Sequence, residues 1–259
     1  MTTASEIIRR AYREGNFIAK GATLSDADGS EGLALLQSIV DTLFPLVVGS
    51  NPKPWYVPVP QRTSTVAHNY PALPGGLSQQ ERYDVRFPPP TSRLLVRATA
   101  PQTIYFQYQP QDGALMEFVD IGHTATITLD ANGALFGTTG GDSTVVIPAD
   151  PDARNAPRRW VYREDYGSWV EITTLALTSD MPFPTSFDDF FITELAMRLT
   201  PSNGNEPRQV TVMRNREMKS FIRNLYVQMA EGWYNKPGGN TTAKTYYDGG
   251  GNSDFNSGR

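Results

Sequence analysis

The chain has no cysteine and only two histidines among its 259 residues. The absence of cysteine excludes disulfide bonds and thiolate metal sites, and it is typical of a reducing compartment. His68 and His123 have no histidine, cysteine or carboxylate partner at the spacing of metal ligands. We therefore expect structural or surface roles for both histidines, and neither a metal nor a cofactor.

Long hydrophobic runs are also missing. The most apolar segment, residues 33–48, is interrupted by Gln37, Asp41 and Pro45 and is too short to span a bilayer. The first 24 residues lack the apolar core of a secretory signal. The formal net charge of −4 gives no general basic field, so non-specific binding of nucleic acid is not expected as the main activity. These features predict a soluble intracellular protein.

Motifs of catalysis are scarce. The segment "GTTGGDST", Gly137 to Thr144, has the composition of a phosphate loop, but it lacks the lysine and precedes a strand, so we expect a hairpin turn. Asp188 and Asp189 are adjacent and would point in different directions on a helix, which favours capping over acid–base chemistry. No GxSxG motif is present. The sequence therefore predicts a protein that is not an enzyme.

Residues 1–49 predict two helices. Thr3 and Glu6 have the spacing of a capping box, and Gly15 follows the last apolar position of the first helix. The second helix is expected to be capped at Asp28 and stopped by Pro45. Prolines then recur through residues 50–91 among several aromatics, which indicates an ordered excursion packed on a surface.

Residues 92–180 contain short segments rich in β-branched and aromatic residues, separated by turn signals such as Asp112-Gly113 and Asn132-Gly133. This pattern predicts a small antiparallel β-sandwich or barrel. Residues 181–234 return to helix, with Ser186 as the expected cap, Pro201 as the end of one helix and Pro207 as the start of the next.

The expected fold class is therefore α+β. The N-terminal and C-terminal helices would form one helical bundle, the β module would be inserted between them, and residues 235–259 would form an extended C-terminal arm. Two independent domains are the alternative.

Basic residues cluster along the last expected helix, against Glu206 and Glu217: Arg208, Arg214, Arg216, Lys219 and Arg223. One interpretation is a solvated face. The other is a contact with an acidic neighbouring subunit or with passing DNA. Aromatic residues are not interleaved in the manner of nucleic-acid platforms, so sequence-specific readout is not expected.

Three stretches carry a resemblance to a known family. "PQDGALMEFVD" followed by "TATITLDANGALFG" resembles a strand–turn–strand module of bacteriophage tail-associated proteins. "WVYREDYGSWVEITTLALTSDMPFPTSFDDFFITELAMRL" resembles the segment in which the β module of a phage head-to-tail adaptor meets its helical bundle. The ending "TYYDGGGNSDFNSGR" is similar to the termini of adaptors in short-tailed phages.

The resemblance implies a structural virion protein of the tail or neck, assembled in the host cytoplasm. Its copies would form a ring, commonly of twelve, beneath the portal and above the tail tube or nozzle, around the channel through which the viral genome is ejected. The arm would reach into the portal, with Tyr246, Tyr247 and Phe255 as buried anchors. Membrane contact is not implied. A disordered terminus with incidental aromatics is the other interpretation of the arm.

A tail-fibre or baseplate protein, whose β module binds a receptor or glycan, is the competing class. A fibre protein would more often show β repeats or coiled-coil heptads, and the sequence shows neither. The helices on both sides of the β module therefore favour the adaptor.

Overall fold

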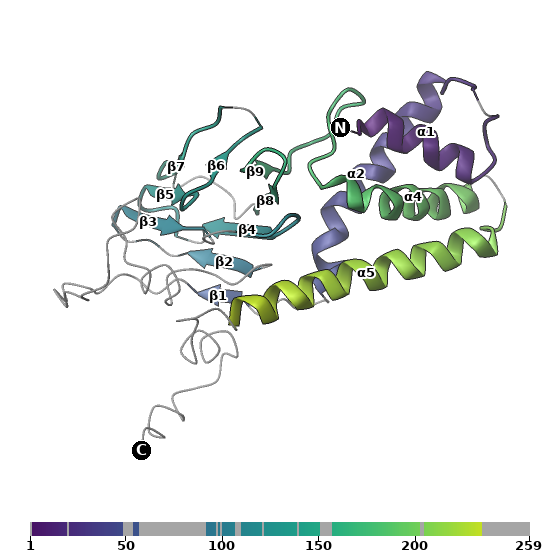
Figure 1. The fold of residues 1–259 in the computed structure, drawn as a ribbon. Coiled ribbons are helices and arrows are strands. Elements are labelled where there is room, and N and C mark those ends of the chain that lie inside the picture. Colours follow the sequence, from purple (N-terminus) through teal and green to yellow (C-terminus); the bar gives the residue numbers. More distant parts are fainter. Residues whose placement is uncertain are drawn as a thin grey trace, which may run out of the picture. The chain divides into compact units, whose positions relative to one another are not determined.

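The computed structural model describes residues 2–19, 21–48, 54–56, 92–96, 98, 100–106, 110–120, 122–138, 140–150, 157–202 and 205–234. The chain divides into a helical unit, residues 1–51 and 172–227, and a β unit, residues 52–171 and 228–259. Over the described residues there are four α-helices and two small mixed sheets (Figure 1). This confirms the predicted α+β class.

Helix α1 (Ala4–Glu14) begins and ends as its sequence predicts. The Thr3 side chain accepts a hydrogen bond from the Glu6 backbone N–H at 3.2 Å, which satisfies one of the unpaired donors of the first turn. The Gly15 N–H donates to the Ala11 carbonyl and closes the last turn. A local capping signal was sufficient here because every partner lies within four residues.

Helix α2 (Asp26–Val48) departs from the prediction at both ends. Its first turn is capped by Ser25, whose hydroxyl accepts the Asp28 N–H at 3.1 Å, so Asp28 lies inside the helix. Pro45 does not stop α2, which continues to Val48. A proline in the last turn removes only one backbone hydrogen bond, and its fixed φ suits a helix. The predicted stop at Pro45 was therefore wrong.

Helix α4 (Asp188–Ser202) follows a 3₁₀ turn, η1 (Thr185–Phe187). Ser186 lies within that turn, so its prediction as the helix cap was wrong. Pro201 lies inside the last turn of α4 and does not end the helix where predicted. As in α2, a proline in the last turn removes only one backbone hydrogen bond. Helix α5 (Gln209–Tyr234) begins two residues after Pro207, and its first turn is closed by the Val212 N–H donating to the Arg208 carbonyl.

Helix α4 is the centre of the helical unit. The sequence predicts one buried face, but α4 is buried on most of its surface, as expected for a helix with neighbours on several sides. Both α1 and α2 pack against it. Its fully or almost fully buried residues are Phe190, Phe191, Ile192, Thr193, Glu194, Leu195, Ala196, Leu199 and Thr200.

The first residues of the chain are fixed to the segment that leads into α4. The Ala4 N–H donates to the Ser179 carbonyl at 2.9 Å, and the Met181 N–H donates to the Thr2 carbonyl at 2.9 Å. The Thr2 hydroxyl donates to the Asp188 carboxylate at 2.5 Å. These contacts join residues about 175 positions apart and explain why both ends of the helical sequence belong to one unit.

The crossing of α1 and α2 depends on a glycine. A Cβ atom at Gly32 would lie 2.5 Å from Cγ2 of Ile8, which is fully buried and β-branched. A Cβ atom at Gly29, one turn earlier in α2, would lie 3.6 Å from Cδ1 of Leu177, an ordinary contact distance. The two glycines therefore differ in the space around them.

Gly32→Ala should destabilise the protein by about 1–3 kcal/mol because it overfills the α1–α2 contact. The matched variant Gly29→Ala should be neutral or stabilising by up to about 1 kcal/mol, since alanine is the better helix former. Urea unfolding followed by circular dichroism measures both. Equal stabilities for the two variants would contradict the close α1–α2 approach at Gly32.

The β unit contains two sheets with different strand orders. One sheet has the order β1-β2-β4-β8-β9-β6, and the other has the order β3-β5-β7. The strands are β1 (Pro54–Tyr56), β2 (Ser92–Val96), β3 (Gln102–Tyr105), β4 (Leu115–Asp120), β5 (Ile127–Asp130), β6 (Leu135–Phe136), β7 (Thr144–Ile147), β8 (Arg158–Arg163) and β9 (Ser168–Glu171). Strand β1 lies in the Pro-rich stretch and at the edge of its sheet, where proline is tolerated.

The prediction of antiparallel pairing was wrong for part of the β unit. Strands β1, β2 and β4 are parallel neighbours, and β3 is parallel to β5, whereas β4, β8 and β9 pair antiparallel. From β3 to β8, each described strand lies in a different sheet from the strand before it. The turn at Asn132-Gly133 does adopt the predicted positive φ, but it passes the chain between sheets. The segment after β6 likewise forms a turn but no hairpin, because β6 pairs with β9 and β7 with β5.

Aromatic side chains form the core of the β unit. The Phe106 ring makes edge-to-face contacts with Phe136, Trp160 and Trp169 at centroid distances of 5.1, 5.5 and 5.1 Å. All four side chains are at most 5% exposed. Edge-to-face pairs of this kind add to the free energy gained from apolar burial. The described tryptophans of β8 and β9 are therefore core residues.

Candidate functional site

Two of the five basic residues expected at an interface are held inside the helical unit. Arg214 of α5 forms ion pairs with Glu14 of α1, at 3.2 Å, and with Asp189 of α4. Lys219 lies 2.7 Å from the carboxylate of Glu194 on α4. These contacts join α5 to α1 and α4. Arg214 and Lys219 therefore hold α5 in position against α1 and α4.

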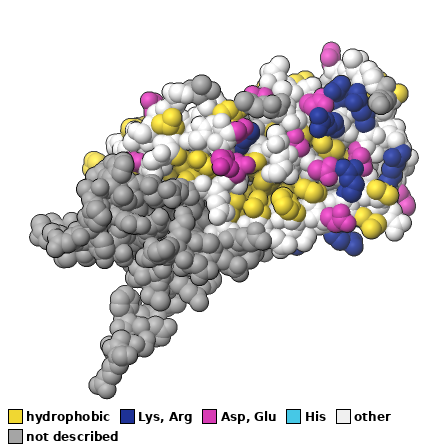
Figure 2. Space-filling view, viewed as in Figure 1, with side chains coloured by type: hydrophobic (Ala, Val, Ile, Leu, Met, Phe, Trp, Pro, Cys, Tyr) yellow, Lys and Arg dark blue, Asp and Glu magenta, His cyan; other side chains and the backbone are white. Residues whose placement is uncertain are grey.

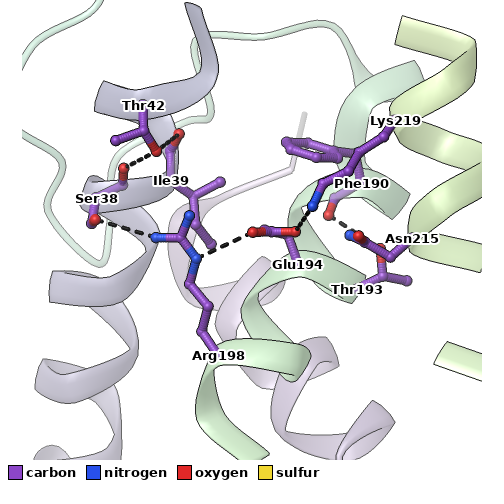
Figure 3. Close-up of polar contacts among 9 residues, drawn as sticks. All are labelled: Ser38, Ile39, Thr42, Phe190, Thr193, Glu194, Arg198, Asn215 and Lys219. Atoms are coloured by element: carbon purple, nitrogen blue, oxygen red, sulfur yellow. Dashed lines mark hydrogen bonds and ion pairs between the residues drawn. The ribbon is translucent and has the colours of Figure 1, made fainter. Parts of the chain in front are cut away.

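Glu194 is the centre of a polar network within the helical unit (Figure 3). Its two oxygens face Lys219 at 2.7 Å and Arg198 at 3.2 Å, and Arg198 also donates to the Ser38 hydroxyl at 3.2 Å. Next to it, the Asn215 amide donates to the Thr193 hydroxyl at 3.2 Å. The network therefore connects α2, α4 and α5 through polar side chains.

The surroundings of Glu194 favour its ionised form. Burial by itself would raise the pKa of this carboxyl, because the Glu194 side chain is only 9% exposed. The ammonium of Lys219 and the guanidinium of Arg198 outweigh that effect, so the pKa of Glu194 lies below its ordinary value. A carboxyl whose folded pKa is lowered adds stability above its unfolded pKa, and this contribution is lost as the pH falls toward the folded pKa.

Stability should therefore decrease below the ordinary carboxyl pKa, and Glu194→Gln should make that decrease smaller. The variant should also be less stable than the wild type at pH 7, because the Lys219 and Arg198 charges lose their shared partner. Urea midpoints between pH 3 and 7 measure both effects. Glu206→Gln, which removes an exposed carboxylate, is the control and should follow the wild-type profile. Parallel profiles for Glu194→Gln and wild type would contradict the role of this network.

The other three predicted basic residues are accessible. Arg208, Arg216 and Arg223 are exposed, and none has an ion pair with another residue that the structure describes. The charges of Arg216 and Arg223 lie on the outward side of α5. These two residues are thus the members of the predicted set that can meet a partner along this helix.

The outward side of α5 also exposes apolar side chains. Val210 is 66% exposed, Met213 is 53% exposed and Phe221 is 45% exposed. The buried face of α5 is formed by other residues: Thr211, Asn215, Ile222, Tyr226 and Met229. These five follow the 3.6-residue period, whereas Val210, Met213 and Phe221 fall outside their stripe. We call Val210, Met213, Arg216, Phe221 and Arg223 the α5 outer face.

Other predicted positions are less informative. Tyr246, Tyr247 and Phe255 lie outside the described residues, as does His68. His123 lies in a turn with φ of 53° and its Nδ1 atom is 3.7 Å from the Asp120 carboxylate. Within the described ranges, no group of three or more histidine or acidic side chains is arranged to hold a metal, and no helix is long and apolar enough to cross a membrane.

The chain matches no protein-family model, and no curated protein matches it.

Proposed function

We propose that this chain is a structural, non-enzymatic virion protein, a head-to-tail adaptor. Its copies form a ring, of twelve subunits in the arrangement that the resemblance implies, between the portal and the tail tube or nozzle. DNA passes through the ring without being read by sequence. The protein needs no cofactor for this role, and its activity is to hold neighbouring molecules in place.

The α5 outer face is the observation that carries this proposal. Three apolar side chains, each at least 45% exposed, and two arginines without ion pairs among the described residues occur on the exposed part of one helix. Exposed apolar groups that lie together on one element are typical of protein–protein contacts. In a ring, a second copy would remove Val210, Met213 and Phe221 from water and stabilise the assembly.

The helical unit also offers the complementary charge. Asp26 and Glu31, in the first two turns of α2, are exposed and have no ion pair with another described residue. A head-to-tail contact, in which α5 of one copy meets the start of α2 of the next, would pair Arg216 and Arg223 with these carboxylates. Contacts between two different surfaces close into a ring when the rotation between copies allows it.

Among the residues that the structure describes, no feature gives comparable support to the fibre alternative. Glycan recognition commonly uses exposed aromatic rings, but Trp160 and Trp169 are 1% and 0% exposed in the sheet core. Helices that precede and follow the β module in the sequence belong to one unit, which is the order that the resemblance to an adaptor implies.

Phe221→Glu combined with Met213→Glu should prevent assembly on the portal while leaving the monomer folded, because both side chains are already exposed in the single chain. Native mass measurements in the presence of the portal test this. Val146→Glu, at a 60% exposed apolar position of β7, is the matched control and should assemble normally. Assembly of the double variant at wild-type level would reject α5 as the contact between subunits.

A further inference from the structure

The helical unit contains a second feature that the adaptor proposal does not use, an open groove of about 380 Å³. Helix α1 contributes Arg10 and Arg13 to it, α4 contributes Asp189, the segment just before α5 contributes Arg208, and α5 contributes Arg214. Lysine and arginine side chains gather over this unit in Figure 2. Four arginines line this groove, two from α1, one from the segment just before α5 and one from α5.

Most of the carboxylates near this groove already have cationic partners. Glu14 and Asp189, the two acidic residues of the lining, share Arg214, and Arg10 pairs with Glu6 at 2.8 Å. Arg13 and Arg208 have no carboxylate partner among the described residues. Four positive and two negative side chains in the lining leave a charge of +2. This positive charge favours the binding of an anion in the groove.

Arg13 lines the groove. Its Nε atom is buried away from solvent, so the terminal N–H groups of its guanidinium are the donors it can offer to a bound oxyanion. The planar guanidinium group presents N–H donors in a fork that matches two oxygens of a phosphate.

We propose that this groove binds a phosphate group, with Arg13 and Arg208 as its principal ligands and Arg10 and Arg214 completing the positive field. A fully enclosed pocket would suit only a small free ion. This groove is open to solvent, so it has room for a phosphate that is part of a larger molecule, and the phosphodiester backbone of DNA has this chemistry. The site belongs to the single chain and does not require ring formation.

The experiment compares two doubly substituted full-length proteins with the same change of charge. Arg13→Gln with Arg208→Gln removes the two arginines of the groove, whereas Arg216→Gln with Arg223→Gln removes two exposed arginines from the α5 outer face. Inorganic phosphate binding is measured by isothermal titration calorimetry, and binding of a fluorescent duplex DNA by anisotropy at fixed salt. Arg208→Gln alone, at an exposed position that precedes α5, is included in case the change at Arg13 disturbs α1.

The groove variant should lose about tenfold or more in phosphate affinity, since a charged hydrogen bond contributes about 1.5–3 kcal/mol. The outer-face variant should change by less than about threefold, and Arg208→Gln alone should show an intermediate loss. Competition between phosphate and DNA would support the site and identify DNA as a source of the group. Phosphate binding without DNA binding would support the site and assign it to a free phosphate ligand. Equal losses in the two double variants, or no saturable binding by the wild type, would overturn the proposal.

Discussion

Leu195→Asp should unfold the helical unit at room temperature. Leu195 is fully buried in α4, the helix that α1 and α2 pack against. The substitution removes a buried apolar side chain, which costs about 2–5 kcal/mol, and places an unpaired carboxylate in the same space. The free energy of unfolding of a domain is only about 5–15 kcal/mol, so the total cost of the substitution approaches the whole stability of the unit.

Circular dichroism at 222 nm during thermal unfolding measures this effect, because the helical unit supplies most of the helical signal. Leu177→Asp is the matched control: Leu177 belongs to the same unit but is 36% exposed. We expect a small change for Leu177→Asp and loss of the cooperative transition for Leu195→Asp. An unchanged melting temperature for Leu195→Asp would contradict the assignment of α4 as the core.

Deleting residues 237–259 should abolish portal binding and leave the helical unit folded. The core of that unit is formed by residues before 227, so its melting transition should not change. The deleted segment carries Tyr246, Tyr247 and Phe255, the proposed anchors, and large aromatics in pockets commonly dominate binding energy. Replacing three such anchors can cost several kcal/mol, or a loss of more than a thousandfold in affinity.

A pull-down with immobilised portal compares the wild type, the truncated chain and a full-length chain with all three aromatics changed to serine. The serine variant separates the anchors from the length of the arm, because it keeps the full length of the segment and changes only the three aromatic side chains. Both variants should fail to bind. Full retention by the truncated chain would reject the docking role of this segment, and retention by the serine variant alone would reject the aromatic anchors.

The sequence predicts local features of the fold well where all partners are close together. The cap at Thr3, the end of α1 at Gly15 and the positive φ of Gly133 depend on residues within one turn. The predicted helix ends at Pro45 and Pro201 were wrong because a proline in the last turn removes only one backbone hydrogen bond and its fixed φ suits a helix. The parallel strand pairs were missed because a strand has the same alternation in either direction.

The sequence shows which charged residues the candidate site contains, but not which partners they meet in the fold. The charges along α5 were visible in the sequence, yet the ion pairs of Arg214 and Lys219 join residues up to 200 positions apart. Their partners, Glu14 and Glu194, carry no local signal of that role. The groove arginines are divided between α1 and the residues just before and within α5, so only the folded chain brings Arg13 and Arg208 to one place.

The proposed function requires that copies of the chain assemble into a ring on the portal. Mass photometry of the full chain with and without the portal tests this requirement most directly. We predict that addition of the portal produces one discrete complex, whose mass exceeds that of the portal by an integral multiple of the chain mass, consistent with a closed ring. A portal peak that does not shift at saturating concentrations of the chain would contradict the account.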